Sequence, residues 1–174
     1  LGVGTGWNPV EYAGLGADFA SRGRRMDEQI RLLRLLWRDP VVRFKGEFES
    51  IDGAGINPLP TNPDIPIWMG GTAPRALRRI GRLGDGWFPL GLPRVALREG
   101  MDLIREAARD AGRPDATIGM QCAIAETGDL DAMVAAARRF EESGATHIAF
   151  ATQDAGFTSM QQHLDSLTRF AEAM

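Results

Sequence analysis

The sequence predicts an α/β protein in which parallel strands alternate with helices. Short apolar segments that end at glycine recur along the 174 residues, and each precedes a segment whose apolar residues have helical spacing. Two architectures use such βα units, the open doubly wound sheet and the (β/α)8 barrel. A barrel has eight strands in about 250 residues, so the five units expected here are about three too few. We expect residues 1–174 to form a single domain.

The first half of the chain is expected to contain a strand, a helix and a hairpin. Residues 1–6 are typical of a strand end that breaks into a glycine-rich loop. Apolar residues recur at helical spacing over residues 21–37, and this helix is expected to end before Pro40, because the residue preceding proline avoids helical backbone angles. Residues 41–51 alternate in polarity and predict an inserted hairpin with its turn at residues 45–46.

The second half repeats the order of strand and helix. Prolines between residues 58 and 66 favour an extended segment, which leads into a short strand at 67–69. A helix is expected at 73–83, with Thr72 as its N-cap and Pro74 in its first turn. The later elements are expected to be strands at 86–88, 118–125 and 147–151, and helices at 94–111, 130–143 and 159–173.

Composition excludes several classes of function. The chain has 20 Lys and Arg against 23 Asp and Glu, so it lacks the basic excess typical of nucleic-acid-binding proteins. No segment approaches the roughly 18 unbroken apolar residues of a membrane span. Cys122 is the single cysteine, which excludes an internal disulfide and favours a reducing, cytoplasmic location. The chain starts at Leu1 without a signal-peptide pattern and is expected to begin within a fold.

The strongest chemical signal is a strand that runs through a glycine turn into a helix over residues 69–75. Backbone N–H groups and the positive end of the helix dipole meet at such a turn and can bind a phosphate, to which an arginine in the first turn adds a charged contact. The same pattern is typical of an ordinary βα turn, and spacing alone favours that simpler interpretation. The candidate cofactor-binding residues here are Met69, Gly70, Gly71, Thr72 and Arg75.

Further candidates lie at the carboxyl ends of expected strands, where barrel active sites are built. Gly4, Thr5, Gly6 and Trp7 end the first strand, and glycine there lets a flat ring approach the backbone closely. Trp7 is expected either to form an apolar wall or to pack under the following loop. Trp87 is expected either to line a cofactor cleft or to pack in the core.

Glu11 is the carboxylate nearest to this rim and a weak candidate for a catalytic acid or base. The simpler expectation is that it caps a helix or pairs with an arginine. Residues 152–154 are polar and follow the last expected strand on the same rim. Neither histidine has a Cys or carboxylate at metal-ligand spacing, so no metal site is expected.

Several blocks of the first half resemble the luciferase-like monooxygenases, especially the branch that uses the deazaflavin coenzyme F420. The blocks are LGVGTGW (1–7) with EY (11–12), RGRRMDE (22–28) running to LW (36–37), FKGEF (44–48), and PIWMGG (66–71) running to GDGW (84–87). The resemblance implies a (β/α)8 barrel that is incomplete here. This chain would supply strands four to eight with their helices and an inserted hairpin.

The resemblance also implies an enzyme that moves hydride between a cofactor and a small organic substrate. The expected cofactor is coenzyme F420, with FMN as the alternative; its phosphate would lie at residues 70–75 and its ring near residues 4–7. A homodimer is expected on the same ground. In the family the acid or base often comes from earlier strands, so the catalytic residues stay unassigned.

One departure from the family pattern concerns Trp7. The sugar-phosphate dehydrogenases of the deazaflavin branch place a catalytic glutamate at that position, so oxidation of a sugar phosphate by that route is not expected. A relative of the same fold that binds a flavin without turnover, or that has a structural role, is the alternative to an enzyme.

Overall fold

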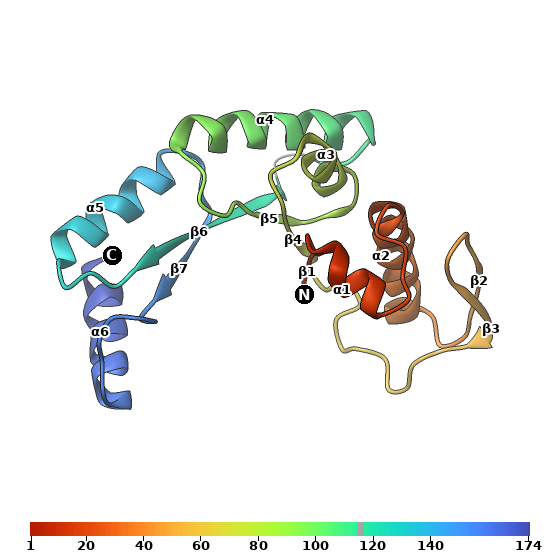
Figure 1. Ribbon diagram of the computed structural model, residues 1–174, viewed down its shortest axis with the longest axis horizontal. Coiled ribbons are helices and arrows are strands. Elements are labelled where there is room, and N and C mark those ends of the chain that lie inside the picture. Colours follow the sequence, from red (N-terminus) through yellow and green to blue (C-terminus); the bar gives the residue numbers. More distant parts are fainter. Residues whose placement is uncertain (115–116) are drawn as a thin grey trace.

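The protein is represented by a computed structural model that describes residues 1–114 and 117–174. Its main sheet is parallel and has the order β1-β4-β5-β6-β7 (Figure 1). The strands of this sheet are β1 (Gly2–Val3), β4 (Trp68–Gly70), β5 (Gly86–Phe88), β6 (Gly119–Ala125) and β7 (His147–Ala151). No pairing joins β1 to β7 within the described residues, so the sheet is open and corresponds to an incomplete (β/α)8 barrel.

The remaining elements are an inserted hairpin and the helices. The hairpin is antiparallel and consists of β2 (Val42–Lys45) and β3 (Ser50–Ala54). The helices are α1 (Pro9–Gly14), α2 (Arg22–Arg38), α3 (Pro74–Leu83), α4 (Arg94–Asp110), α5 (Leu130–Glu141) and α6 (Met160–Ala173). Figure 1 shows an arch, with α2 and the hairpin at one end, α3 and α4 across the middle, and α5 and α6 at the other end. Across the described chain, no helix combines the length and the apolar character that a membrane span requires.

The core lies between the sheet and the helices. Alternate strand residues point to this side and are almost fully buried, as Met69, Trp87 and Met120 show. They pack against apolar residues of the helices, which are Ile30, Leu77, Ile80, Leu97, Met101 and Ile104. Cys122 belongs to the same cluster, and burial raises the pKa of its thiol, so it behaves as a small hydrophobic residue.

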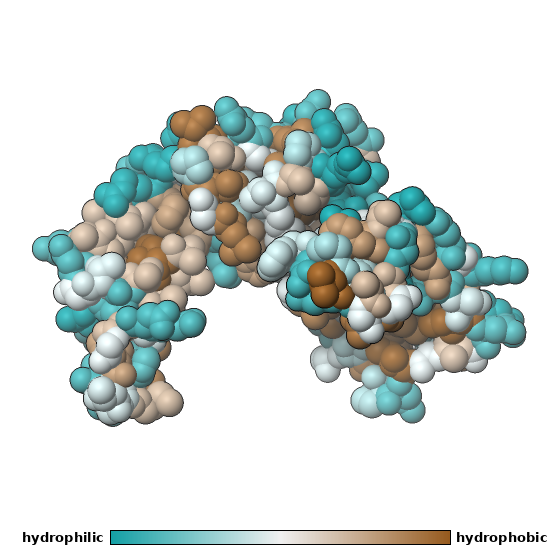
Figure 2. All heavy atoms as spheres, in the orientation of Figure 1, coloured by the Kyte–Doolittle hydropathy of each residue, from teal (hydrophilic) through white to brown (hydrophobic). Residues whose placement is uncertain are grey.

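Among the residues that the structure describes, no helix covers the opposite face of the sheet (Figure 1), and Figure 2 shows the arch hollowed on this side. Trp68 lies on this face beside Phe88 and His147, with ring centroids 5.4 and 4.9 Å apart. Glycine makes room for the indole, because a Cβ at Gly86 or Gly119 would lie 2.1 or 2.6 Å from its atoms. Trp68 pairs in register with Gly86, which pairs with Gly119, so the ring lies across neighbouring strands.

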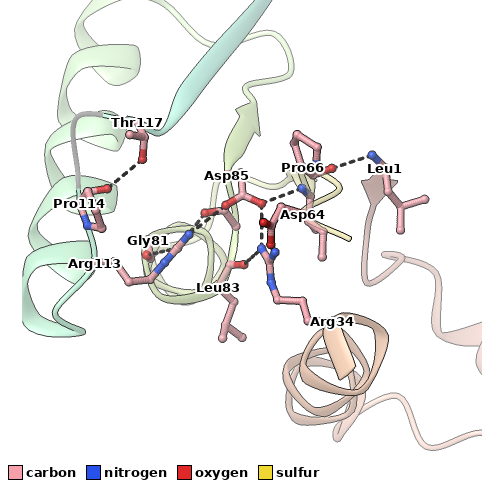
Figure 3. A network of polar contacts seen from close by, with 12 residues as sticks. Leu1, Arg34, Asp64, Pro66, Gly81, Leu83, Asp85, Arg113, Pro114 and Thr117 are labelled. Atoms are coloured by element: carbon pink, nitrogen blue, oxygen red, sulfur yellow. Dashed lines mark hydrogen bonds and ion pairs between the residues drawn. The ribbon is translucent and has the colours of Figure 1, made fainter. Parts of the chain in front are cut away.

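Asp85 joins three parts of the chain at the amino-terminal edge of the sheet (Figure 3). Its Oδ2 accepts hydrogen bonds from Arg34 Nη2 and from the backbone N of Ile67, both at 2.8 Å, and its Oδ1 accepts one from Arg113 Nη2 at 3.0 Å. Arg113 also donates to the carbonyls of Gly81 and Gly84. Asp85 therefore ties α2, β4 and the segment after α4 together.

Most expected elements are confirmed, and the structure adds one element and changes the length of one turn. The six-residue helix α1 was not expected; it forms because the Asn8 side chain accepts a hydrogen bond from Val10 N at 3.0 Å and Pro9 occupies the first turn. The hairpin turn is longer than expected, since the second strand starts at Ser50 and not at residue 47.

The carboxylate of Glu28 in α2 accounts for the longer turn. It accepts hydrogen bonds from the backbone N of Glu47, Phe48 and Glu49 at 2.7, 3.0 and 2.6 Å. These amides therefore do not pair in a strand ladder. Burial opposes ionisation of Glu28, but the three N–H groups outweigh it and hold the pKa of this carboxyl below its usual range.

We expect Asp85→Asn to lower the free energy of unfolding by about 2 kcal/mol, because Arg34 and Arg113 both lose their counter-ion. Urea denaturation at neutral pH measures this. The matched control is Asp52→Asn, which removes an ion pair with Arg43. In this pair the side chain of Asp52 is 94% exposed and that of Arg43 is 81% exposed. That change should cost less than about 0.5 kcal/mol. Equal effects of the two variants would contradict the central role of Asp85.

We expect Glu28→Gln to destabilise the protein in a pH-dependent way. A carboxyl whose pKa is lowered on folding stabilises the folded state above its unfolded pKa, and this stabilisation is lost as the pH falls through the folded pKa. The difference in unfolding free energy between wild type and variant should therefore be largest near pH 7 and shrink below about pH 4. Urea denaturation across this range tests it; a constant difference would refute it.

Candidate functional site

The carboxyl ends of β1 and β4 meet at one edge of the sheet. The two strands pair in parallel, with Val3 opposite Met69. The loops that follow them therefore leave the sheet side by side, and a small crevice is lined by Gly4, Thr5 and Gly70. The expected phosphate turn and the expected ring-binding loop are thus brought together. This arrangement is what barrel active sites require of neighbouring strand ends.

The turn after β4 depends on Gly71 and Trp87. Gly71 has a φ of 128°, and a Cβ there would lie 2.8 Å from the Cβ of Ala76. The indole Nε1 of Trp87 donates a 2.8 Å hydrogen bond to the carbonyl of Gly71. Trp87 has no exposed surface, so it cannot touch a cofactor as the cleft-lining hypothesis required. It packs in the core and holds the turn from behind.

The start of α3 leaves several amides open. The N-cap is Ala73, and no side chain caps this helix, so the expectation that Thr72 is the cap is wrong. The amides of Ala76 and Leu77 bond to the carbonyl of Ala73 at 2.8 and 3.1 Å. Within the described chain, the amides of Thr72, Ala73 and Arg75 have no acceptor. These N–H groups and the helix dipole make this end attractive to an anion.

Arg75 and Arg78 extend this positive region along α3. Both side chains are exposed, and neither forms an ion pair with any residue that the structure describes. Arg79, by contrast, bonds to Asp27 of α2 and is mostly buried. Arg75 lies in the first turn of the helix, where a guanidinium can reach an anion held by the open amides.

The loop after β1 offers open backbone and one exposed aromatic ring. A Cβ at Gly4 would meet no atom within 4 Å, so there is room above this strand end. The hydroxyl of Tyr12 donates to the carbonyl of Thr5 at 2.5 Å and fixes the loop against α1. Gly6 has a φ of 68° next to this ring. Trp7 is 83% exposed, so the expectation that it packs under the following loop is wrong.

A depression of about 440 Å³ opens beside this loop. Gly4, Thr5, Gly6, Glu11, Tyr12, Leu15, Ala17, Arg22, Arg25, Met26 and Gln29 line it. Glu11 is exposed and accepts a 3.1 Å hydrogen bond from the Asn8 side chain, as a residue in the first turn of α1. Arg25 is paired with Glu49 at 3.0 Å. The positive charge of Arg25 is therefore offset within the protein.

Arg22 is the residue of this depression that the sequence analysis missed. Its guanidinium carbon lies 3.6 Å from the centroid of the Phe19 ring, and Nη1 donates to the Phe19 carbonyl at 2.7 Å. Its Nε is buried and has no hydrogen-bond partner in the part of the chain that the structure describes. A buried donor without a partner is costly and rare. The guanidinium is therefore held in place by Phe19, while its Nε–H donor stays unsatisfied within the described residues.

The carboxyl ends of β6 and β7 carry a second set of polar groups. Glu126 follows β6, is almost fully buried, and accepts hydrogen bonds from Ser166 of α6 and from the backbone N of Gly128. The Ser166 hydroxyl, more than any other contact, keeps the pKa of Glu126 below its usual range. Thr152 bonds to His163 of α6 at 2.7 Å. These contacts fasten α6 to the sheet.

The described residues contain no group of three or more His, Cys, Asp or Glu side chains that could hold a metal ion. His147, expected at the amino end of the last strand, lies there and contacts Trp68.

Comparison with known proteins gives consistent results. A family model described as luciferase-like monooxygenase matches residues 1–173. An uncharacterized protein of Mycobacterium tuberculosis is 47% identical over 88 residues, which cover 51% of this chain and 30% of that protein. An F420-dependent glucose-6-phosphate dehydrogenase of Mycolicibacterium gilvum is 33% identical over 138 residues, which cover 77% of this chain and 38% of that protein. The chain thus spans about a third of the length of these curated relatives.

Solved structures show the same fold. An F420-dependent secondary alcohol dehydrogenase in complex with an F420-acetone adduct aligns with a TM-score of 0.64 at 20% identity, over 99% of this chain and 60% of that one. The coenzyme F420 dependent tetrahydromethanopterin reductase of Methanopyrus kandleri aligns with a TM-score of 0.58 at 19% identity, over 76% of this chain and 43% of that one.

The glycine pair after β4 should respond asymmetrically to substitution. Gly71→Ala should lower the unfolding free energy by about 2 kcal/mol, because of its positive φ and the close approach to Ala76. Gly70→Ala is the matched control: a Cβ there meets nothing within 4 Å, so the change should stay within about 0.5 kcal/mol. Thermal unfolding of both variants measures this, and equal stability of the two would contradict the geometry of the turn.

Proposed function

The chain belongs to the luciferase-like monooxygenase family, and from that premise we propose that it acts as an oxidoreductase that transfers hydride between coenzyme F420 and a small organic substrate. The proposal rests chiefly on the open amides of Thr72, Ala73 and Arg75 at the start of α3. They would bind the phosphate of the cofactor. The names of several relatives and of two solved structures supply the identity of that cofactor.

The residues at this edge fit a flat cofactor with an anionic tail. Gly4 and Gly70 leave open space where any side chain would intrude, and the two lie on neighbouring strand ends. The open amides lie next to that space. Arg22 supplies positive charge at the depression beside the loop, with its guanidinium fixed over the Phe19 ring. Flat apolar surface, amide donors and positive charge are thus combined at one rim.

We assign distinct roles to these groups. Gly71, Thr72 and Arg75 would hold the phosphate, with Met69 and Gly70 forming the strand end beneath it. Gly4, Thr5, Gly6 and Trp7 would lie along the ring, with the exposed indole of Trp7 excluding water from it. The bound cofactor would supply the hydride chemistry.

Glu11 is our candidate for proton transfer, because it is the carboxylate among the residues that line the depression. Trp7 stands where the sugar-phosphate dehydrogenases place a glutamate. We therefore propose a substrate other than a sugar phosphate, even though some relatives are named F420-dependent glucose-6-phosphate dehydrogenase.

We also propose that the protein is a cytoplasmic homodimer. This rests on the family resemblance and on the single, buried Cys122, which suits a reducing compartment. Light scattering of the purified chain tests the dimer: a mass of one chain at micromolar concentration would refute it.

Titration with coenzyme F420, followed by its visible absorbance, tests the phosphate site. Arg75→Ala should weaken binding about tenfold, as expected for one charge-assisted hydrogen bond worth about 1.4 kcal/mol. Arg78→Ala is the matched control, since it removes the same charge from the same helix one turn further from the open amides. Equal weakening by both variants would show a general charge effect and would argue against the assigned turn.

The same titration with FMN separates the two cofactors, and turnover separates an enzyme from a binding protein. We expect tighter binding of F420 than of FMN and reduction of bound F420 by a small alcohol or aldehyde donor under anaerobic conditions. Tight, phosphate-dependent binding without any redox cycle over a panel of such donors would favour the non-catalytic alternative.

A further inference from the structure

The edge of β6 is unpaired along half of its length, because β5 is short. Residues of β5 and β6 pair at Gly86 with Gly119 and at Trp87 with Met120, and no further pair follows. The next donor in this ladder would belong to Pro89, which has no N–H group. The ladder therefore ends there, while β6 continues to Ala125.

The direction of the open groups follows from the hydrogen bonds on both sides of β6. Gly119 N bonds to Asp85 O on the β5 side, whereas Glu126 N bonds to Ala151 O on the β7 side. In a parallel strand the N–H and C=O of one residue point to the same side and alternate from residue to residue. The groups of Ala123 and Ala125 therefore point to the β5 side, where no described residue bonds to them.

These backbone groups border a groove of about 310 Å³ between β6 and α5. Its lining is apolar except for one hydroxyl and consists of Ala123, Ile124, Ala125, Thr127, Ala132, Met133, Ala136 and Phe140. Alanine at positions 132 and 136 of α5 keeps the groove open. Its residues are not shared with the depression beside the β1 loop or with the phosphate turn.

The open edge has a fixed pattern of acceptors and donors. The amide of Ala123, the carbonyl of Ala123 and the amide of Ala125 read donor, acceptor, donor along the strand, and both residues line the groove. A planar nitrogen heterocycle that carries an amino group beside a ring nitrogen presents a donor and an acceptor at one edge. Its flat faces would contact the Met133 and Phe140 side of the groove.

We propose that this groove is a second binding site, independent of the cofactor site, for a flat, uncharged amino-substituted nitrogen heterocycle such as adenine. The amino group donates to the carbonyl of Ala123, and the ring nitrogen accepts from the amide of Ala125. The apolar side chains of α5 cover the ring. A groove of this volume lies at the lower end of the range usual for small-molecule pockets, which suits one or two fused rings.

Adenine titrated into the isotope-labelled chain and followed by amide NMR tests the proposal. We expect saturable shifts of the Ala123 and Ala125 amides, with no comparable shift at Thr72 or Arg75. Purine, which lacks the amino group, should bind about tenfold more weakly, as expected when one hydrogen-bond donor is removed. Absence of a saturable shift, or equal affinity for purine and adenine, would overturn the proposal.

Variants of α5 provide the second arm of the test. Ala136→Phe should fill the groove and reduce adenine affinity at least about tenfold. Arg138→Phe is the matched control on the same helix, because Arg138 is exposed and does not line the groove. Ala132→Leu, at an exposed lining position, serves as a second filling variant should Ala136→Phe not fold. Undiminished binding in a folded filling variant would overturn the proposal, whether or not coenzyme F420 binds at its own site.

Discussion

The carboxylate of Asp85 is the contact on which the rest of this sheet depends. It precedes β5 by one residue and takes hydrogen bonds from the start of β4, from α2 and from the segment after α4. Two arginines share this carboxylate, and each donates to a different oxygen. The short strands β4 and β5 have few ladder bonds of their own. Their position is therefore set largely from the amino-terminal edge, opposite to the candidate site.

That separation explains how a binding edge can stay open without loosening the fold. At the carboxyl edge, the amides ahead of α3 have no acceptor among the described residues, and the space over Gly4 and Gly70 is open. A polar contact that stiffens this turn comes from inside the core, where the Trp87 indole donates to the carbonyl of Gly71. Stability and the proposed binding thus use opposite edges of the same strands, as in other parallel α/β folds. The open donors are tolerated because they face solvent.

The sequence was informative where local rules decide the outcome. Apolar spacing gave α2, α4 and α6 within a few residues, and proline marked the end of α2 and the start of α3. It was less informative where a distant side chain intervenes. Glu28 lies about 20 residues from the hairpin turn that it reshapes, and no local pattern encodes that contact. The Asn8-Pro9 pair, in contrast, is a local pattern typical of a helix start, with Asn8 as N-cap and Pro9 in the first turn of α1. This helix could have been predicted from the sequence.

The candidate site shows the same division. The glycine turn and the loop after β1 were identified from spacing. That the two lie side by side follows only from the register of β1 with β4. The burial of Arg22 Nε without a hydrogen-bond partner depends on the Phe19 ring and on the loop packing around it. The sequence alone therefore could not distinguish Arg22 from the other arginines. For Trp87 the sequence left cleft lining and core packing open, because its position at a strand end does not decide between them. Strand alternation turns it inward.

The indole of Trp68 has a consequence for how this sequence can change over evolutionary time. Its ring occupies space that a methyl group at position 86 or 119 would need, so these positions are coupled across three strands. A smaller residue at position 68 would remove the clash at Gly86, whereas a Cβ at Gly119 would in addition lie 3.0 Å from the Thr146 hydroxyl oxygen. Positions 68, 86 and 119 therefore constrain one another, and substitutions at these positions should occur together in homologues.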